Sequence, residues 1–250
     1  MKRITIIGTV ILTIGLGLTF VPLYVVPTHL EIADTIPTIL RNDGKTEYAD
    51  ILESNLNSFK KGLSQSDEFL NAREHYFNPD TKKGLANFKD GGTVASDRFA
   101  MSVNYWLKGD KDNSMIHLGY TAHIVQDLTV PYHAALTPLG NHTDYENWIS
   151  EHESEYFIQS GGLYNVSSAY NYVEYNANQS IKYIDENYTT IAENMIPLAQ
   201  RSTAGLVNLF FENIEKNITL EYTTKTDYGT AGVIVSVFGI GIILAGRFRF

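Results

Sequence analysis

The chain has 250 residues and no cysteine. This absence excludes disulfides, thiolate zinc ligands, cysteine nucleophiles and iron–sulfur clusters. Basic residues are also scarce, with 19 lysines and arginines against 28 aspartates and glutamates. A broad basic surface for duplex nucleic acid is therefore not expected, and the sequence indicates no protein partner. A hydrophobic fraction of 44% excludes a disordered chain and favours a packed core.

Two apolar runs of membrane length lie near the ends of the chain. Residues 4–26 contain no charged side chain and follow Lys2 and Arg3. At about 1.5 Å per residue, this run can cross a hydrocarbon layer of roughly 30 Å. A cleaved signal peptide is the alternative, but the sequence before Pro27 offers no small-x-small cleavage site. The second run, residues 229–246, precedes Arg247 and Arg249.

These runs divide the chain into four expected parts. They are an N-terminal transmembrane anchor or uncleaved signal (1–26), an extracellular domain (27–228), a C-terminal transmembrane helix (229–246) and a short cytoplasmic tail (247–250). Basic residues flank the outer end of each run, so both termini are expected in the cytoplasm and the main domain outside the cell membrane. That domain holds 15 of the 19 basic and all 28 acidic residues, a formal charge of −13. Bound divalent cations could neutralise part of this charge.

Apolar residues between the two runs mostly recur at intervals of three and four, which predicts an all-α, multi-helix domain. The expected helices cover residues 29–41, 48–63, 93–107, 114–129, 145–157, 168–186 and 188–215. Pro37 and Pro197 predict kinks or breaks in the first and last of them. Residues 71–92 predict a long irregular loop, a kind of segment that is usually functional or mobile.

Five side chains of the metal-ligand type lie within 24 positions. His123 and Asp127 are four residues apart, which places both on one helix face, and His142 and Glu146 repeat this spacing. His133 lies between the two pairs. Imidazole and carboxylate are the zinc ligands available to a chain without thiolates. Each pair alone could be a solvated helix face, but the concentration of all five in one segment favours a metal site.

The positions of two other histidines do not indicate metal binding. His117 lies six residues before His123, which turns it by roughly 240° around a helix of about 3.6 residues per turn. We therefore expect His117 to pack against or support the site rather than to bind a metal. His152 lies among three glutamates, which predicts a surface position.

The pattern His-x3-Asp-x5-His-x8-His-x3-Glu resembles the zinc-dependent phospholipase C family, part of the phospholipase C and S1/P1 nuclease superfamily. Other blocks match in the family's order, and the resemblance covers most of residues 28–211. These blocks are Thr28-His29-Leu30, Gly62 followed by Asp67, His75-Tyr76-Phe77-Asn78-Pro79-Asp80, and Arg201-Ser202-Thr203-Ala204-Gly205. The resemblance implies an all-helical domain with up to three zinc ions in one cleft.

The resemblance also implies the ligands of each ion. The first zinc would be held by Asp67, His75, His123 and Asp127. The second would be held by His133, His142 and Glu146. A third would share the carboxylate of Asp127 with His29 and, in the family, with the free amine and carbonyl of an N-terminal tryptophan. Because Trp106 and Trp148 are both internal, this chain departs from the family there, so two zinc ions are expected and the third site lacks its usual chelate.

The implied activity is that of a membrane-anchored, zinc-dependent phosphodiesterase. It would hydrolyse a glycerophospholipid in the bilayer on the glycerol side of phosphate, with a metal-activated water and no serine or cysteine nucleophile. Asp67 is the candidate catalytic residue that orients or deprotonates this water. Two alternatives stay open. One is a single-strand nuclease of the S1/P1 type, although such nucleases typically have an aspartate where Glu146 stands. The other is a non-catalytic membrane protein with structural zinc.

Overall fold

Helical periodicity dominates the middle of the sequence, and helices dominate the structure. The computed structural model describes residues 26–67, 72–86 and 88–221. Within these ranges there is no β-strand, and an isolated bridge joins Asn78 to Lys83. The predicted all-α class is confirmed. The α-helices are α2 (Val26–Asn42), α3 (Thr46–Ser54), α4 (Leu56–Ser66), α5 (Gly91–Leu107), α6 (Lys111–Asp127), α7 (Pro131–Ala134), α8 (Asn141–Ile149), α9 (Ala169–Ser180) and α10 (Tyr188–Glu215). The described residues also contain three short 3-10 helices, η1 (Ala72–Glu74), η2 (Glu153–Tyr156) and η3 (Ile181–Tyr183).

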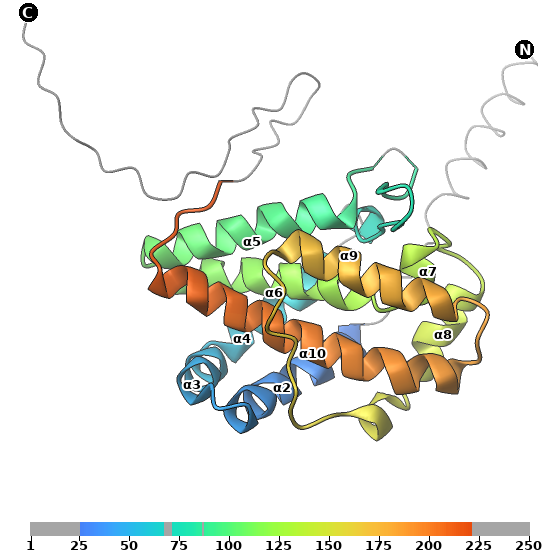
Figure 1. Cartoon of the computed structure of the whole chain (residues 1–250), viewed down its shortest axis with the longest axis horizontal. Coiled ribbons are helices and arrows are strands. Elements are labelled where there is room, and N and C mark those ends of the chain that lie inside the picture. Colours follow the sequence, from blue (N-terminus) through green and yellow to red (C-terminus); the bar gives the residue numbers. More distant parts are fainter. Residues whose placement is uncertain (1–25, 68–71, 87, 222–250) are drawn as a thin grey trace, which may run out of the picture.

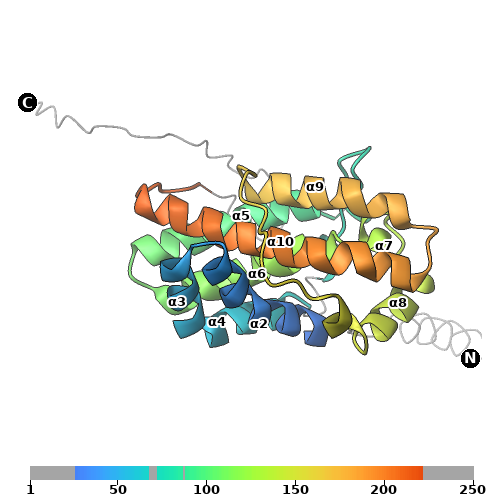
Figure 2. The same ribbon diagram turned by 60° about the horizontal axis from the view of Figure 1, so that its bottom comes forward.

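The long helices α5, α6, α9 and α10 run side by side (Figures 1 and 2). Helices α2, α3 and α4 cover one flank of this group, and the short helices α7 and α8 lie at one end of it. Helix α6 contacts α4, α5, α9 and α10, so it is the central element of the domain.

The sequence of α6 explains this central position. Asp110 is the N-cap, and its side chain accepts a hydrogen bond from the backbone N–H of Asn113 at 3.2 Å. Twelve of the 17 residues of α6 are buried, so the helix has no broad solvent face. A helix that is buried all round lies in the core rather than at the surface. The side chains of its last turn, including His123 and Asp127, are therefore held inside the domain.

Two glycines allow α4 and α6 to come into backbone contact. A methyl group added at Gly119 of α6 would lie 2.0 Å from the carbonyl oxygen of Phe59 in α4. One added at Gly62 of α4 would lie 1.9 Å from the carbonyl oxygen of Ile116 in α6. Neither distance is sterically possible, so only glycine permits this approach.

The helix boundaries differ from the predicted ones in several places. The single helix expected at 48–63 is two, α3 and α4, separated at Asn55. The helix expected at 145–157 is α8, which begins at Asn141 and is followed by η2. The helix expected at 168–186 ends as α9 at Ser180 and continues as η3. Pro37 and Pro197 break neither α2 nor α10. Each proline lacks the backbone N–H of one helical hydrogen bond, and tertiary packing keeps the helix continuous at that point. The described residues of the loop expected at 71–92 contain only η1, the isolated bridge and the start of α5.

The two predicted membrane spans are not represented among these helices. Residues 4–25 of the first run and all of the second, 229–246, lie outside the described residues. Within the described residues, no helix combines the length and the apolar character needed to cross a bilayer. The expected division of the chain into anchors, domain and tail therefore stays a prediction.

The close approach of α4 and α6 makes a testable claim about stability. We expect Gly119→Ala to lower the free energy of unfolding by at least about 2 kcal/mol, because the added methyl forces the two backbones apart. Thermal and urea unfolding would measure the loss. Asn57→Ala, an exposed position on α4, is the matched control and should change stability by less than about 0.5 kcal/mol. Equal stability of Gly119→Ala and the wild type would contradict the contact.

Candidate metal centre

The first cluster of donors forms at the end of α6. His123 and Asp127 lie one turn apart, and both are buried, with exposed fractions of 1% and 3%. Asp67, the C-cap of α4, and His75, just after η1, face them from two other segments. The Nε2 atom of His123 lies 3.2 Å from Oδ1 of Asp67 and 3.2 Å from Oδ2 of Asp127. The Nδ1 atom of His75 lies 2.8 Å from Oδ2 of Asp127.

The second cluster comes from α7 and α8. A turn after α6 leads to Pro131, the first residue of α7, and brings His133 near Asp127, with 4.0 Å between His133 Nδ1 and Asp127 Oδ2. His142 and Glu146 lie one turn apart on α8, and 2.8 Å separates His142 Nε2 from Glu146 Oε1. The Nε2 atom of His133 lies 2.9 Å from Nε2 of His142 and 3.5 Å from Oε1 of Glu146.

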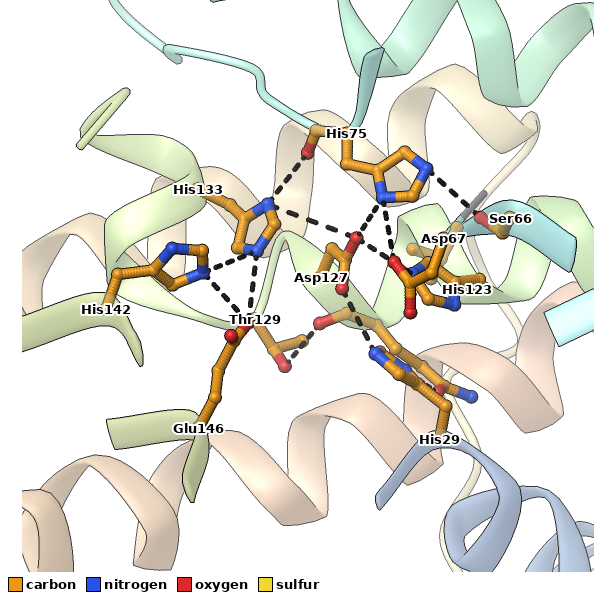
Figure 3. Close-up of polar contacts among 12 residues, drawn as sticks. His29, Ser66, Asp67, His75, His123, Asp127, Thr129, His133, His142 and Glu146 are labelled. Atoms are coloured by element: carbon orange, nitrogen blue, oxygen red, sulfur yellow. Dashed lines mark hydrogen bonds and ion pairs between the residues drawn. The ribbon is translucent and has the colours of Figure 1, made fainter. Parts of the chain in front are cut away.

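His29 on α2 completes the arrangement from the opposite side of Asp127. Its Nε2 atom lies 3.2 Å from Oδ1 of Asp127, and its ring stacks on the His123 ring with 4.0 Å between centroids. Figure 3 shows the Asp127 carboxylate among these rings, with His29 at its Oδ1 atom and with His75, His123 and His133 around its Oδ2 atom. The structure thus brings together all eight side chains that the sequence predicted for the site. Three groups of residues could each hold an ion, because the donor atoms within each group lie within 4.8 Å of one another. The groups are His29, His123 and Asp127; Asp67, His75 and His123; and His133, His142 and Glu146.

The chemistry of these donors fits divalent zinc. Ligands held at about 2.0–2.1 Å in a tetrahedron lie about 3.3 Å from each other, and the donor separations of 2.8–3.5 Å in the second cluster bracket this value. In the first cluster, Oδ2 of Asp67, Oδ2 of Asp127 and both ring nitrogens of His123 are buried without a hydrogen-bond partner among the described residues. Buried polar atoms are normally paired. Buried nitrogen and oxygen donors that converge in this way form a site for a cation, which would take the place of the protons on the histidines.

Hydrogen bonds behind the donors fix the histidine rings. The Nδ1 atom of His133 is 3.2 Å from the His75 carbonyl oxygen, to which it can donate, and this leaves Nε2 for a metal. The Nδ1 atom of His29 is 2.7 Å from Oε1 of Gln126, and the amide of Gln126 is itself oriented by its bond to Thr203 at 3.1 Å. Metal-binding histidines usually have such a partner on the second ring nitrogen.

The same buried charges shift the pKa values of the donors. Burial opposes the charged form of His123, but the carboxylates of Asp127 and Asp67 outweigh burial and raise the pKa of His123 well above its ordinary value. Burial likewise opposes ionisation of Asp127, but His123 and His133 lower the pKa of Asp127 well below its ordinary value. The pKa of Asp67 is also lowered, because His123 outweighs the effect of burial. All these carboxylates are therefore ionised at neutral pH, as a metal ligand must be.

Three supporting residues were not predicted from the sequence. Tyr76 is buried and stacks on His133, with 4.6 Å between ring centroids. The hydroxyl of Ser66 lies 3.1 Å from Nε2 of His75, and Gln126 holds His29 as described above. Each of these residues adjoins a predicted donor in the sequence, and this adjacency is the signal that could have found them.

The two histidines expected to take no part in ligation do lie outside the clusters. His117 stacks on Tyr105 with 5.3 Å between ring centroids, and burial, assisted by Arg98, lowers the pKa of His117 to about 4. His152 stacks on Trp148, and its Nδ1 atom lies 2.7 Å from the Trp148 carbonyl oxygen. It is half-buried rather than fully on the surface, because the Trp148 ring covers one of its faces.

The chain belongs to the zinc-dependent phospholipase C family, whose family model matches residues 28–201. It is similar to the phospholipase C of Clostridium novyi, with 24% identity over 238 residues that cover 76% of this chain and 60% of that protein. The phospholipase C of Clostridium perfringens is 26% identical over 159 residues, which cover 54% of this chain and 40% of that enzyme.

Solved structures support the same fold. The alpha toxin of Clostridium absonum superimposes with a TM-score of 0.68 at 20% identity, over 78% of this chain and 65% of the toxin. The alpha-toxin from an avian strain of Clostridium perfringens gives a TM-score of 0.64 at 20% identity, over 75% of this chain and 63% of the toxin. The chain thus spans less than two thirds of the length of each of these relatives.

The shared position of Asp127 predicts how zinc content responds to substitution. We expect His142→Ala to lose one zinc ion per chain, because it removes a donor from the second cluster alone. Asp127→Asn should weaken zinc binding at the first cluster by at least about 100-fold, since it removes a direct ligand rather than a supporting group. Native mass spectrometry would count the ions. His152→Gln is the control and should retain the wild-type content. Full zinc content in both donor variants would show that His142 and Asp127 are not zinc ligands.

Proposed function

We propose that the chain is a zinc-dependent phosphodiesterase that hydrolyses membrane glycerophospholipids in the manner of a phospholipase C. One observation carries the proposal: a cavity of about 320 Å³ lies directly over donors of both clusters and has apolar walls. The apolar residues of its lining include Leu85, Ala86, Phe88, Pro138 and Leu139. A glycerophospholipid matches such a cavity, because its phosphate can contact the donors while its hydrocarbon chains contact the apolar walls.

Family membership and donor chemistry support two zinc ions. Asp67, His75, His123 and Asp127 would hold the first, and His133, His142 and Glu146 would hold the second. His29 and Asp127 offer a third position, without the terminal amine that completes it elsewhere in the family. When bound, the ions would supply Lewis acidity toward the phosphoryl oxygens and a nucleophilic water at neutral pH.

Asp67 is the residue that we propose as the general base. It lines the cavity, and its Oδ2 atom has no hydrogen-bond partner among the described residues. The lowered pKa of Asp67 keeps this carboxylate ionised at neutral pH, so the carboxylate can orient the attacking water and accept its proton. The water adds to phosphorus, the bond from phosphorus to the glycerol oxygen breaks, and the glycerol oxygen takes up a proton that replaces the one given to Asp67. The products are a diradylglycerol, which stays in the membrane, and a soluble phosphorylated headgroup.

This role predicts the behaviour of Asp67→Asn. With zinc, the wild-type chain should release diradylglycerol from phospholipid vesicles, and the variant should lose activity by about 100-fold or more, because a positioned base contributes that much. Native mass spectrometry should show whether the variant keeps its zinc, and Lys83→Gln, an exposed change outside the cavity, is the control. Unchanged turnover in a zinc-loaded Asp67→Asn variant would contradict the role.

Single-stranded DNA serves as the second substrate in the same assay. The −13 charge of residues 27–228 opposes binding of a polyanion, so we expect no cleavage. Cleavage of DNA without lipid turnover would replace the phospholipase with a nuclease. Turnover of neither substrate by the zinc-loaded chain would leave a structural role for the metals.

We also propose that the apolar runs at 4–26 and 229–246 anchor the chain in the cell membrane, with the cavity on the extracellular side and both termini in the cytoplasm. Their length, their lack of charged residues and the flanking basic residues support this placement. The full chain should stay in the membrane fraction after an alkaline carbonate wash. Protease added to intact cells should cut between the two runs and not at the termini. Recovery of the chain in the wash supernatant would contradict anchoring.

A further inference from the structure

Exposed apolar side chains lie at the mouth of the cavity. Among the described residues, three large hydrophobic side chains are exposed: Phe88, Leu139 and Tyr175. Phe88 (42% exposed) and Leu139 (71% exposed) both line the cavity over the metal donors, whereas Tyr175 lies on α9 and does not line it. Side chains as exposed as these lie at the edge of a cavity rather than in its depth. We call Phe88 and Leu139 the apolar rim.

The two residues of the apolar rim come from distant segments of the chain. Leu139 lies on the loop between α7 and α8, three residues before the donor His142, and Phe88 lies between η1 and α5. The guanidinium of Arg73 lies over one face of the Phe88 ring, 5.2 Å from its centroid, so Leu139 is the more open of the two. A single exposed hydrophobic residue is common on a protein surface. Two that meet at one cavity indicate contact with an apolar partner.

The start of α2 identifies the partner within reach. The apolar run that we propose as an anchor ends at residue 26, where α2 begins. His29, which lines the cavity, follows after three residues, or about 5 Å of helix. An anchor that ends in the headgroup region therefore holds the cavity close to the surface of the same membrane. The apolar rim belongs to this cavity, so the nearest apolar partner is the lipid.

Charge does not supply this contact. Residues 27–228 have a formal charge of −13. Attraction to anionic headgroups requires clusters of basic residues near the membrane surface, and an acidic domain is repelled from them. Removal of exposed apolar side chains from water is then the driving force that remains. The expected partner is a lipid layer without net charge.

We propose that the apolar rim inserts Leu139 and Phe88 into the surface of the lipid bilayer, so that the mouth of the cavity opens onto the layer that holds the substrate. The inference rests on the proposed phospholipase activity and assigns the surface through which the lipid enters. A phospholipid could then move from the layer to the metal donors without exposing its hydrocarbon chains to water. A second copy of the chain is the competing partner, and the experiment distinguishes it.

The absence of cysteine allows a direct test of insertion. Leu139→Cys and Tyr175→Cys each give the full chain a single thiol for the fluorophore NBD. Both labelled proteins are reconstituted with zinc in phosphatidylcholine vesicles. Lipids with a nitroxide on the acyl chain should quench NBD at position 139 at least about twofold more than at position 175, because inserted groups lie at the boundary of headgroups and acyl chains. Equal quenching would contradict insertion. A blue-shifted probe at 139 that the nitroxide does not quench would assign the rim to a protein partner.

Kinetics separate docking from contact inside the cavity. The reconstituted chain is assayed on long-chain phosphatidylcholine in the vesicle and on dibutyroyl phosphatidylcholine dissolved in the water. Leu139→Ser should lower the ratio of the first kcat/KM to the second by about tenfold, which corresponds to about 1.4 kcal/mol. Tyr175→Ser is the matched control, because it removes an exposed apolar side chain that does not line the cavity, and it should leave the ratio unchanged. Equal losses on both substrates would place Leu139 against the bound lipid and overturn the docking role.

Failure of the inference and failure of the proposed function give different results. The fluorescence measurement does not require turnover. Quenching at position 139 in a zinc-loaded chain that hydrolyses neither lipid would refute the phospholipase and retain the lipid-docking rim. Hydrolysis of both lipids with no excess quenching at position 139 would refute the rim and retain the phospholipase.

Discussion

The buried carboxylate of Asp127 is the constraint on which the rest of the domain depends. It is the last residue of α6, where the helix dipole is negative and an added negative charge is unfavourable. Burial of an unpaired charge costs several kcal/mol, so the carboxylate requires polar partners that can donate hydrogen bonds, or a bound cation, within a few ångströms. His29, His75, His123 and His133 supply them from four segments, with nitrogen to oxygen distances of 2.8–4.0 Å. The packing of α2, α6, α7 and the η1 loop is organised around this need.

Histidine alone satisfies the need only in part. Several donor atoms around Asp127 remain buried without hydrogen bonds among the described residues, and the raised pKa of His123 reflects a surplus of negative charge around it. Bound cations would remove both costs at once. Folding and metal binding are expected to be linked in such a site, since ligands that repel or compete in the empty protein converge favourably on an ion. In an acidic domain without disulfides, bound cations would therefore stabilise the folded state.

Local features of the site were predictable from the sequence, whereas its assembly was not. The pairs His123 with Asp127 and His142 with Glu146 follow from the helical repeat, because residues four apart share a face. The meeting of the two pairs depends on the turn at Pro131, and no periodicity encodes its direction. Asp67, His75 and His29 came only from resemblance to a family. The split between α3 and α4 and the positions of Phe88 and Leu139 on the cavity walls likewise depend on contacts between distant segments.

The glycine contact between α4 and α6 has a geometric consequence for the site. Asp67 follows the end of α4, and His123 and Asp127 occupy the end of α6. Sliding one helix past the other would drive a side chain into the space that Gly62 and Gly119 keep empty, so the contact acts as an axial stop. Main-chain atoms cannot change rotamer. They therefore set the distance between the Asp67 carboxylate at the end of α4 and the His123 imidazole on α6. Replacing either glycine with a better helix former would change the distance between the donors, although every donor side chain would still be present.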